Sequence, residues 1–188
     1  MVKESAKGKA KITKELPLPD NVNASMNEEF LLIKGPNGEL RREIKHHNIS
    51  IRAGDKKIVL ESEKGLKEDK KIIGSLEAHV KNMISGSMQS HTYTLKICSG
   101  HFPMNVSVSG NKLAIKNFLG EKVPRTLQLK EKAEVKIEGD IIRVSSISKE
   151  IAGQVSADIE QLTRRPGFDT RIFQDGIYII NKDGKEMK

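Results

Sequence analysis

The pattern of apolar and polar positions in this chain occurs twice, at a spacing of about 80 residues. In each copy, four apolar residues and one glycine follow the period of about 3.6 residues that is typical of an amphipathic helix. The positions are Ile72, Gly74, Leu76, Val80 and Met83 in the first copy, and Ile151, Gly153, Val155, Ile159 and Leu162 in the second. Self-similarity of this kind indicates a repeated structural unit, so we predict two copies of one small module.

The two predicted helices end at different signals. The first ends at Gly86, because glycine is common just beyond helix C-termini. The second spans residues 149–162 and stops before the Pro-Gly pair at 166–167, since proline cannot continue a helix. A glycine inside a helix costs about 1 kcal/mol relative to alanine. We therefore interpret Gly74 and Gly153 as positions where each helix approaches its sheet closely.

Short predicted strands precede each helix. Two strands flank a Gly-Asp turn directly upstream, at 49–51 and 57–60 in the first copy and at 135–137 and 141–144 in the second. The first copy also has an apolar run at 30–33 and a second predicted strand at 40–44, joined as a hairpin by a Pro-Asn-Gly turn whose Asn-Gly pair supplies positive φ angles. The second copy alternates apolar and polar residues at 93–98, 105–108 and 112–116. The predicted fold class is α+β, with two tandem duplicated modules, each a small, mostly antiparallel β-sheet packed against one α-helix.

The sequence divides into five predicted segments. They are a basic N-terminal extension at 1–20, a first module at 21–84, a junction at 85–91, a second module at 92–180, and a C-terminal tail at 181–188. The extension carries lysines with no apolar stretch behind them, so we expect no secretory signal. It is interpreted either as a flexible tail that becomes ordered on a phosphate surface or as a solvated terminus.

Composition favours a polyanionic partner. The formal net charge is +8 at pH 7, and 31% of the residues are charged. Nucleic acid is the first candidate partner and an anionic membrane the second. The membrane interpretation is weaker, because no apolar run approaches the roughly 20 residues that a spanning helix needs. Cys98 is the only cysteine, which fits a reducing, cytosolic compartment.

Motifs of catalysis and metal binding are missing from the sequence. It contains no phosphate-binding loop, no dinucleotide-binding glycine motif and no nucleophile elbow. The five histidines lack the spacing of metal ligands, and a single cysteine cannot complete a structural zinc site. We therefore expect a protein that is not an enzyme, with no catalytic residues, no metal, no cofactor and no small-molecule substrate.

Candidate RNA-binding residues form two groups in the second module. The first group lies in a loop with cations around asparagine and glycine, and consists of Lys116, Asn117, Gly120, Lys122 and Arg125. The second group, Arg164, Arg165 and Arg171, surrounds the bend at 166–167, a segment without a counterpart in the first module. Guanidinium groups bind phosphates bidentately and stack on bases. The alternatives are an ordinary hairpin with exposed lysines, and arginines that complement the dipole at a helix C-terminus.

Three segments carry a family resemblance. They are Gly-His-Phe-Pro-Met-Asn-Val at 100–106, Lys-Asn-Phe-Leu-Gly-Glu-Lys at 116–122, and Arg-Ile-Phe-Gln-Asp-Gly-Ile-Tyr-Ile at 171–179, the last with Gln161 upstream and Lys182 downstream. Together they resemble the universal large-subunit ribosomal protein L-six family, in its archaeal and eukaryotic form. The match covers nearly the whole chain, and the two tandem α/β modules of that family agree with the duplication.

This resemblance implies a non-enzymatic, cytoplasmic component of the large ribosomal subunit. It implies binding to large-subunit rRNA near the sarcin-ricin loop and the landing site of translational GTPases, with neighbouring ribosomal proteins as further partners. It supports the two groups of residues above and adds Lys182 to them. Two alternatives remain: an extraribosomal RNA-binding or ribosome-assembly factor with a related duplicated fold, and a small hydrolase with carboxylates or histidines brought together by folding.

Overall fold

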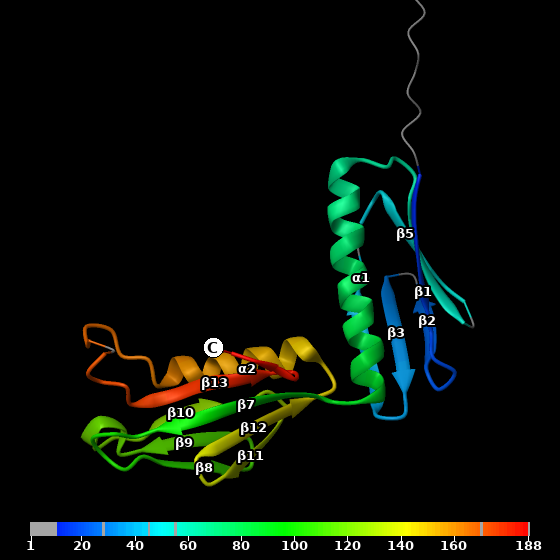
Figure 1. The fold of residues 1–188 in the computed structure, drawn as a ribbon. Coiled ribbons are helices and arrows are strands. Elements are labelled where there is room, and N and C mark those ends of the chain that lie inside the picture. Colours follow the sequence, from blue (N-terminus) through cyan, green and yellow to red (C-terminus); the bar gives the residue numbers. More distant parts are fainter. Residues whose placement is uncertain (1–10, 28, 45, 55, 170, 188) are drawn as a thin grey trace, which may run out of the picture. The chain divides into compact units, whose positions relative to one another are not determined.

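The structure is a computed structural model that describes residues 11–27, 29–44, 46–54, 56–169 and 171–187. It divides into two compact units, Met1–Gln89 and Ser90–Lys188 (Figure 1). The boundary falls inside the segment 85–91 that the sequence suggests as a junction. No helix in the described ranges has both the length and the apolar character needed to cross a membrane.

The described residues of unit 1 form six strands followed by one helix. In chain order these are β1 (Ile12–Pro17), β2 (Asn23–Asn27), β3 (Phe30–Gly35), β4 (Gly38–Glu43), β5 (Ile49–Ala53), β6 (Lys57–Ser62) and α1 (Lys67–Met88). The strands form two antiparallel sheets, with the orders β1-β6-β5 and β2-β3-β4. The helix packs against β1, β3, β4 and β6, and its buried residues Ile73, Val80 and Met83 complete the core.

Unit 2 has the same series of elements and then adds two strands. They are β7 (His91–Cys98), β8 (Asn105–Ser109), β9 (Lys112–Lys116), a 3-10 turn (Phe118–Gly120), β10 (Arg125–Gln128), β11 (Glu134–Glu138), β12 (Ile141–Ser146), α2 (Lys149–Leu162), β13 (Gly176–Lys182) and β14 (Lys185–Glu186). The sheet orders are β10-β9-β8 and β11-β12-β7-β13-β14, with all neighbours antiparallel. The helix packs against β7, β12 and β13 (Figure 1).

The internal duplication is confirmed element by element. Strands β1 to β6 and α1 correspond in order and pairing to β7 to β12 and α2. The helix predicted at 149–162 has those bounds in the structure, and the α+β fold class is confirmed. Strand β13 has no counterpart among the described residues of unit 1, and it pairs with β7, the first strand of the second repeat. The segment that the sequence marked as unmatched is therefore an added strand with a long connection before it.

The extension predicted at 1–20 needs a correction. Its last part forms β1, which pairs with β6, and Leu16 is buried with only 3% of its surface exposed. Lys11 and Lys14, assigned to a basic tail, form ion pairs with Glu61 and Glu77 at 3.0 and 3.7 Å. Because lysines are frequent in this segment, its apolar positions were not recognised as one face of a strand. Residues 1–10 lie outside the described residues.

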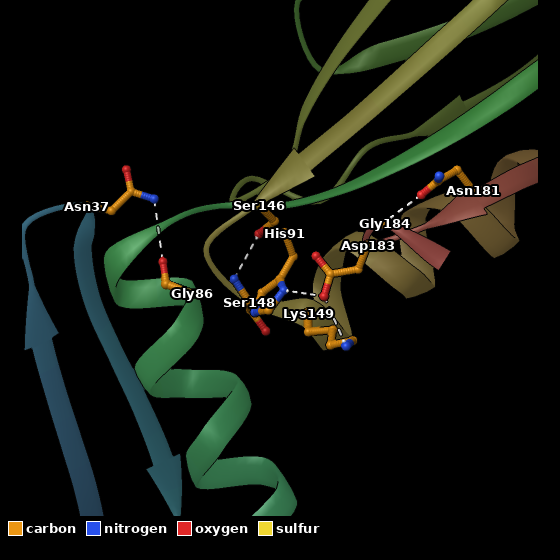
Figure 2. A network of polar contacts seen from close by, with 9 residues as sticks. All are labelled: Asn37, Gly86, His91, Ser146, Ser148, Lys149, Asn181, Asp183 and Gly184. Atoms are coloured by element: carbon orange, nitrogen blue, oxygen red, sulfur yellow. Dashed lines mark hydrogen bonds and ion pairs between the residues drawn. The ribbon is translucent and has the colours of Figure 1, made fainter. Parts of the chain in front are cut away.

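The predicted end of the first helix at Gly86 is also wrong, because α1 continues to Met88. The turn of the β3–β4 hairpin satisfies carbonyls at the helix end. The Asn37 backbone N–H donates to Ser87 O at 2.9 Å, and Asn37 Nδ2 donates to Gly86 O at 3.4 Å (Figure 2). The approach is close, since a Cβ on Gly35 would lie 2.6 Å from Ser87 O. A tertiary contact therefore extends the helix beyond its local stop signal.

The three glycine interpretations have different outcomes. The hairpin at Asn37-Gly38 is confirmed, but only its glycine has a positive φ angle, 143°. A Cβ on Gly153 would lie 3.3 Å from the Tyr93 hydroxyl oxygen, which agrees with a close approach of α2 to its sheet. Gly74 is exposed and faces open space, so the same interpretation is wrong for α1.

Candidate nucleic-acid interface

Several connections of unit 2 meet at one end of its sheets. This loop end consists of residues 99–104 between β7 and β8, 117–124 between β9 and β10, 139–140 between β11 and β12, and 163–169 with 171–175 between α2 and β13 (Figure 1). Every predicted RNA-binding residue except one lies in this loop end or directly beside it.

Asp175 joins two of these connections. Its Oδ1 accepts hydrogen bonds from the backbone N–H groups of Gly100 at 2.6 Å and His101 at 3.0 Å. Its Oδ2 bonds to His101 Nδ1. Burial raises the pKa of Asp175, but the hydrogen bonds from His101 and Gly100 outweigh burial and hold that pKa below its usual value. A carboxylate is thus fixed beneath the loop end.

A series of ring contacts continues from this carboxylate along the bend. The His101 ring stacks on Phe173 with 5.1 Å between centroids, and Phe168 meets Phe173 edge to face at 4.9 Å. The guanidinium carbon of Arg165 lies 4.2 Å from the centroid of Phe168. Contacts of these kinds are attractive. They give the bend a defined shape that depends on its own aromatic residues.

Arg125 has an internal structural role. Its Nε and Nη2 donate to the Glu121 carboxylate at 2.8 and 2.6 Å, and its Nη1 donates to Leu162 O at 2.6 Å. The guanidinium also lies over the Phe118 ring, 4.3 Å from its centroid. The hydrogen bond from Arg125 is the main cause of a lowered pKa at Glu121. This predicted RNA-binding residue therefore ties the loop at 117–124 to the last carbonyls of α2.

Asn117 and Gly120 determine the path of the loop. Asn117 and Gly120 have φ angles of 60° and 78°, and Leu119 between them has 48°. Such angles are unusual for residues other than glycine. Asn117 Nδ2 donates to Pro103 O at 3.0 Å, and a Cβ on Gly120 would lie 3.6 Å from the Phe102 ring. The two residues shape the surface on which Lys116 and Lys122 stand exposed.

The remaining cations of the loop end are exposed. Among the residues that the structure describes, no ion pair is found for Lys116, Lys122, Arg164 or Arg165. Arg171 has 88% of its side chain exposed and forms a forked pair with Asp169, with 2.7 Å between Nη2 and Oδ2. Four cations of the loop end are therefore exposed without an ion pair, and a fifth, Arg171, is exposed with a local carboxylate partner.

A model of the family described as ribosomal protein L6 matches residues 18–89 and 102–176. The first range lies in unit 1 and the second in unit 2. The chain belongs to the ribosomal protein L6 family. The resemblance drawn from the sequence is confirmed. This is a family of structural ribosomal proteins, so the protein is a ribosomal protein and not an enzyme.

Archaeal members of the ribosomal protein L6 family are similar over almost their whole length. The chain is 41% identical to the large ribosomal subunit protein uL6 of Methanobrevibacter smithii over 174 residues, which cover 93% of this chain and 98% of that protein. It is 42% identical to the protein of that name from Methanococcus vannielii over 178 residues, covering 95% and 98%. For Methanothrix thermoacetophila the identity is 40%, with 91% and 97% covered.

Lys182 is the predicted residue that the structure places elsewhere. It lies at the far end of β13 from the bend, about 20 Å from Gly176 at about 3.3 Å per residue. Its neighbour Asp183 accepts from Lys149 Nζ at 3.0 Å and bonds to His91 Nδ1 at 2.9 Å (Figure 2). That end of unit 2 is held together by a buried histidine and a carboxylate, and Lys182 does not share a surface with the arginines.

The two repeats differ in how the end of the helix meets the connection between the third and fourth strands of the repeat. In unit 1, the turn at 36–37 is closed by the last residues of α1, which continue beyond Met83. Met83 corresponds in the repeat to Leu162, where α2 ends. There Thr163 Oγ1 donates to Glu160 O and accepts from the Ile177 N–H at 3.0 Å. The chain then turns away, and the longer loop at 117–124 occupies the position of the short turn.

Residues that the sequence did not single out as site residues support this surface. Asp175, His101 and Phe168 hold the connections of the loop end together. Positive charge, the main sequence signal for an RNA-binding residue, selects none of them. Asp175 and His101 are 74 residues apart in the chain, so no local pattern could pair them. Their only signal was their presence in the two motifs of the family resemblance.

Proposed function

We propose that this protein is a structural component of the large ribosomal subunit in the cytoplasm, and that it binds large-subunit rRNA through the loop end of unit 2. Neighbouring ribosomal proteins are its other partners. The relatives carry the name of a large-subunit protein, which supports the assignment to that subunit.

The grouping of available cations supports the choice of surface. Lys116, Lys122, Arg164 and Arg165 stand exposed on one end of one unit, and the side chains beneath them are satisfied by internal contacts. Lysine and arginine that neutralise phosphates release condensed counterions, and this drives binding to nucleic acid. Folded RNA favours a preformed surface of this kind, because it is recognised largely by shape.

We further propose that the bound rRNA lies near the sarcin-ricin loop and that translational GTPases approach close by. The support for this location is the resemblance of the segments at 100–106, 116–122 and 171–179 to the family, and each of these segments includes residues of the loop end. A brace at this position would act by holding the rRNA in one shape, with no chemical step of its own.

Crosslinking within assembled ribosomes tests the location. Large subunits that contain the protein are irradiated, and the crosslinked nucleotides and peptides are mapped. We expect crosslinks from peptides 116–125 and 164–175 to rRNA next to the sarcin-ricin loop. Crosslinks from unit 1 alone, or to a distant rRNA domain, would contradict the proposal.

Sedimentation separates a ribosomal component from an assembly factor. A component stays with mature large subunits through a high-salt gradient, whereas an assembly factor leaves before maturation. We expect the protein in the mature subunit fraction. Its restriction to precursor particles would show that the alternative is right.

A further inference from the structure

A cavity of about 460 Å³ opens at the loop end, among the C-terminus of α2, the 3-10 turn and the bend before β13. Six of its lining residues matter here. They are two partly exposed rings, Phe168 and Tyr178, two arginines, Arg164 and Arg165, and the polar residues Glu160 and Gln161. The cavity therefore combines aromatic surface, positive charge and hydrogen-bonding groups.

The two rings are held in place before any ligand binds. Phe168 has 38% of its surface exposed and is supported by the edge of Phe173 and by Arg165. Tyr178 is 41% exposed, and its ring lies so close to the chain that a Cβ on Gly176 would come within 3.2 Å of it. Rigid apolar rings that face an open cavity bind a flat ligand with little loss of conformational entropy.

Polar groups in the cavity are also positioned. Glu160 Oε1 accepts the Ile179 N–H at 3.1 Å, which fixes the carboxylate. Burial raises the pKa of Tyr178, and the nearby Cys98, Asp175 and Glu160 raise it further, so the hydroxyl stays protonated and can donate. Gln161 offers both a donor and an acceptor. These groups suit the edge of a ring that itself donates and accepts hydrogen bonds.

We propose that this cavity holds one unstacked nucleobase of the rRNA, stacked on Phe168 and Tyr178, with the adjoining phosphates on Arg164 and Arg165. This inference rests on the proposed function and adds the recognition of a single base to a surface that otherwise reads shape and charge. Unstacked bases in RNA are commonly recognised by aromatic stacking, arginine planes and hydrogen bonds to the base edge.

The charge of the rim favours a nucleotide over a protein side chain. Within the described part of the chain, neither Arg164 nor Arg165 forms an ion pair, and a nucleobase necessarily brings phosphates with it. Unit 1 supplies a control pair of the same chemistry. There Arg41 lies 3.6 Å from the centroid of the Phe30 ring, on strands β4 and β3, and neither residue lines the cavity.

The experiment measures affinity of the full chain for an rRNA fragment that contains the sarcin-ricin loop. Phe168→Leu and Tyr178→Leu each remove a ring but keep an apolar side chain, and Phe30→Leu is the matched control. Stacking predicts a loss of about 5- to 100-fold for each cavity variant, with an unchanged salt dependence because no phosphate contact is removed. Phe30→Leu leaves the affinity unchanged. Thermal unfolding of each variant verifies that it folds.

A second experiment removes the nucleobase from the RNA and leaves the aromatic rings of the protein unchanged. Ultraviolet crosslinking first identifies the nucleotide joined to the peptide 164–180, and that nucleotide is then made abasic. We expect the abasic RNA to bind wild type more weakly, by the factor that the Phe168→Leu/Tyr178→Leu double variant loses on intact RNA. The double variant should bind abasic and intact RNA equally, because removing the base and removing the rings abolish the same stacking interaction.

Different failures separate this inference from the proposed function. Salt-dependent binding that is unaffected by the ring variants, or that produces no crosslink in 164–180, overturns the nucleobase site and leaves the proposed function intact. A crosslink in ribosomes between these rings and another protein also overturns it. The absence of any salt-dependent binding by wild type overturns both.

Discussion

Asp175 Oδ1 accepts the Gly100 N–H at 2.6 Å, across 75 positions of the sequence. This contact, with the His101 hydrogen bonds to the same carboxylate, links the bend after α2 to the loop after β7. The exposed Arg164 and Arg165 belong to the bend that this link holds. The surface proposed to bind rRNA therefore depends on an anion that is 3% exposed and that no external ligand needs to touch.

Asp175→Asn should destabilise unit 2. Loss of hydrogen bonds to a charged acceptor costs about 1–3 kcal/mol of unfolding free energy. Because the pKa of Asp175 is lowered in the folded state, its contribution is present above the ordinary value of 3.8 and is lost as the pH falls through the lowered pKa. Chemical unfolding at pH 7 and at a series of pH values below 4 measures this. The difference between wild type and variant should shrink toward low pH.

A matched control is Asp20→Asn, since Asp20 is 90% exposed and its ion pair with Lys56 is 3.7 Å long. Exposed pairs of this kind contribute little, so no change in unfolding is expected. An Asp175→Asn protein as stable as wild type at pH 7 would show that the link does not hold the loop end.

Arg125→Lys should weaken the fold and leave the electrostatics of RNA binding intact. Lysine keeps the charge but cannot donate at once to the Glu121 carboxylate and Leu162 O. We expect a lower melting temperature and faster amide exchange in 117–124, with an unchanged salt dependence of rRNA binding. Arg143→Lys, at an exposed pair with Glu138, is the control. An Arg125→Lys variant as stable as wild type would show that these hydrogen bonds do not hold the loop at 117–124.

The repeated helices allow a comparison of two equivalent glycines. Gly74→Ala should stabilise unit 1 by up to about 1 kcal/mol, because alanine has the higher helix propensity and its Cβ meets open space. Gly153→Ala should gain less or lose stability, since its Cβ would lie 3.3 Å from the Tyr93 hydroxyl. Thermal unfolding of both variants tests this. Equal gains at both positions would show that α2 can shift without cost.

Local patterns predicted what local interactions determine. The bounds of α2 follow from its apolar period, and Ser148 caps it by accepting the Ile151 N–H at 3.4 Å. The order of strands follows from the repeat. The grouping of cations around 116–125 and 164–171 was visible because charge is read directly from the residues.

Features set by contacts distant in sequence could not be predicted in this way. The extension of α1 past Gly86 depends on Asn37, 49 residues earlier. The internal role of Arg125 depends on a carbonyl 37 residues later. Strand β1 was missed because its lysines pair with carboxylates of β6 and α1 that the sequence does not place beside them.

Neutralisation of rRNA phosphates by the exposed arginines of the loop end underlies the proposed function. Its most direct test compares two double variants that remove the same charge, Arg164→Ala/Arg165→Ala in unit 2 and Arg52→Ala/Lys57→Ala in unit 1. Affinity for the sarcin-ricin rRNA fragment is measured from low to high salt. We expect the first variant to lower the slope of log affinity against log salt by roughly 1.4 to 1.8, at about 0.7–0.9 per lost phosphate contact, and the second to leave it unchanged. Equal slopes for both variants and wild type would contradict it.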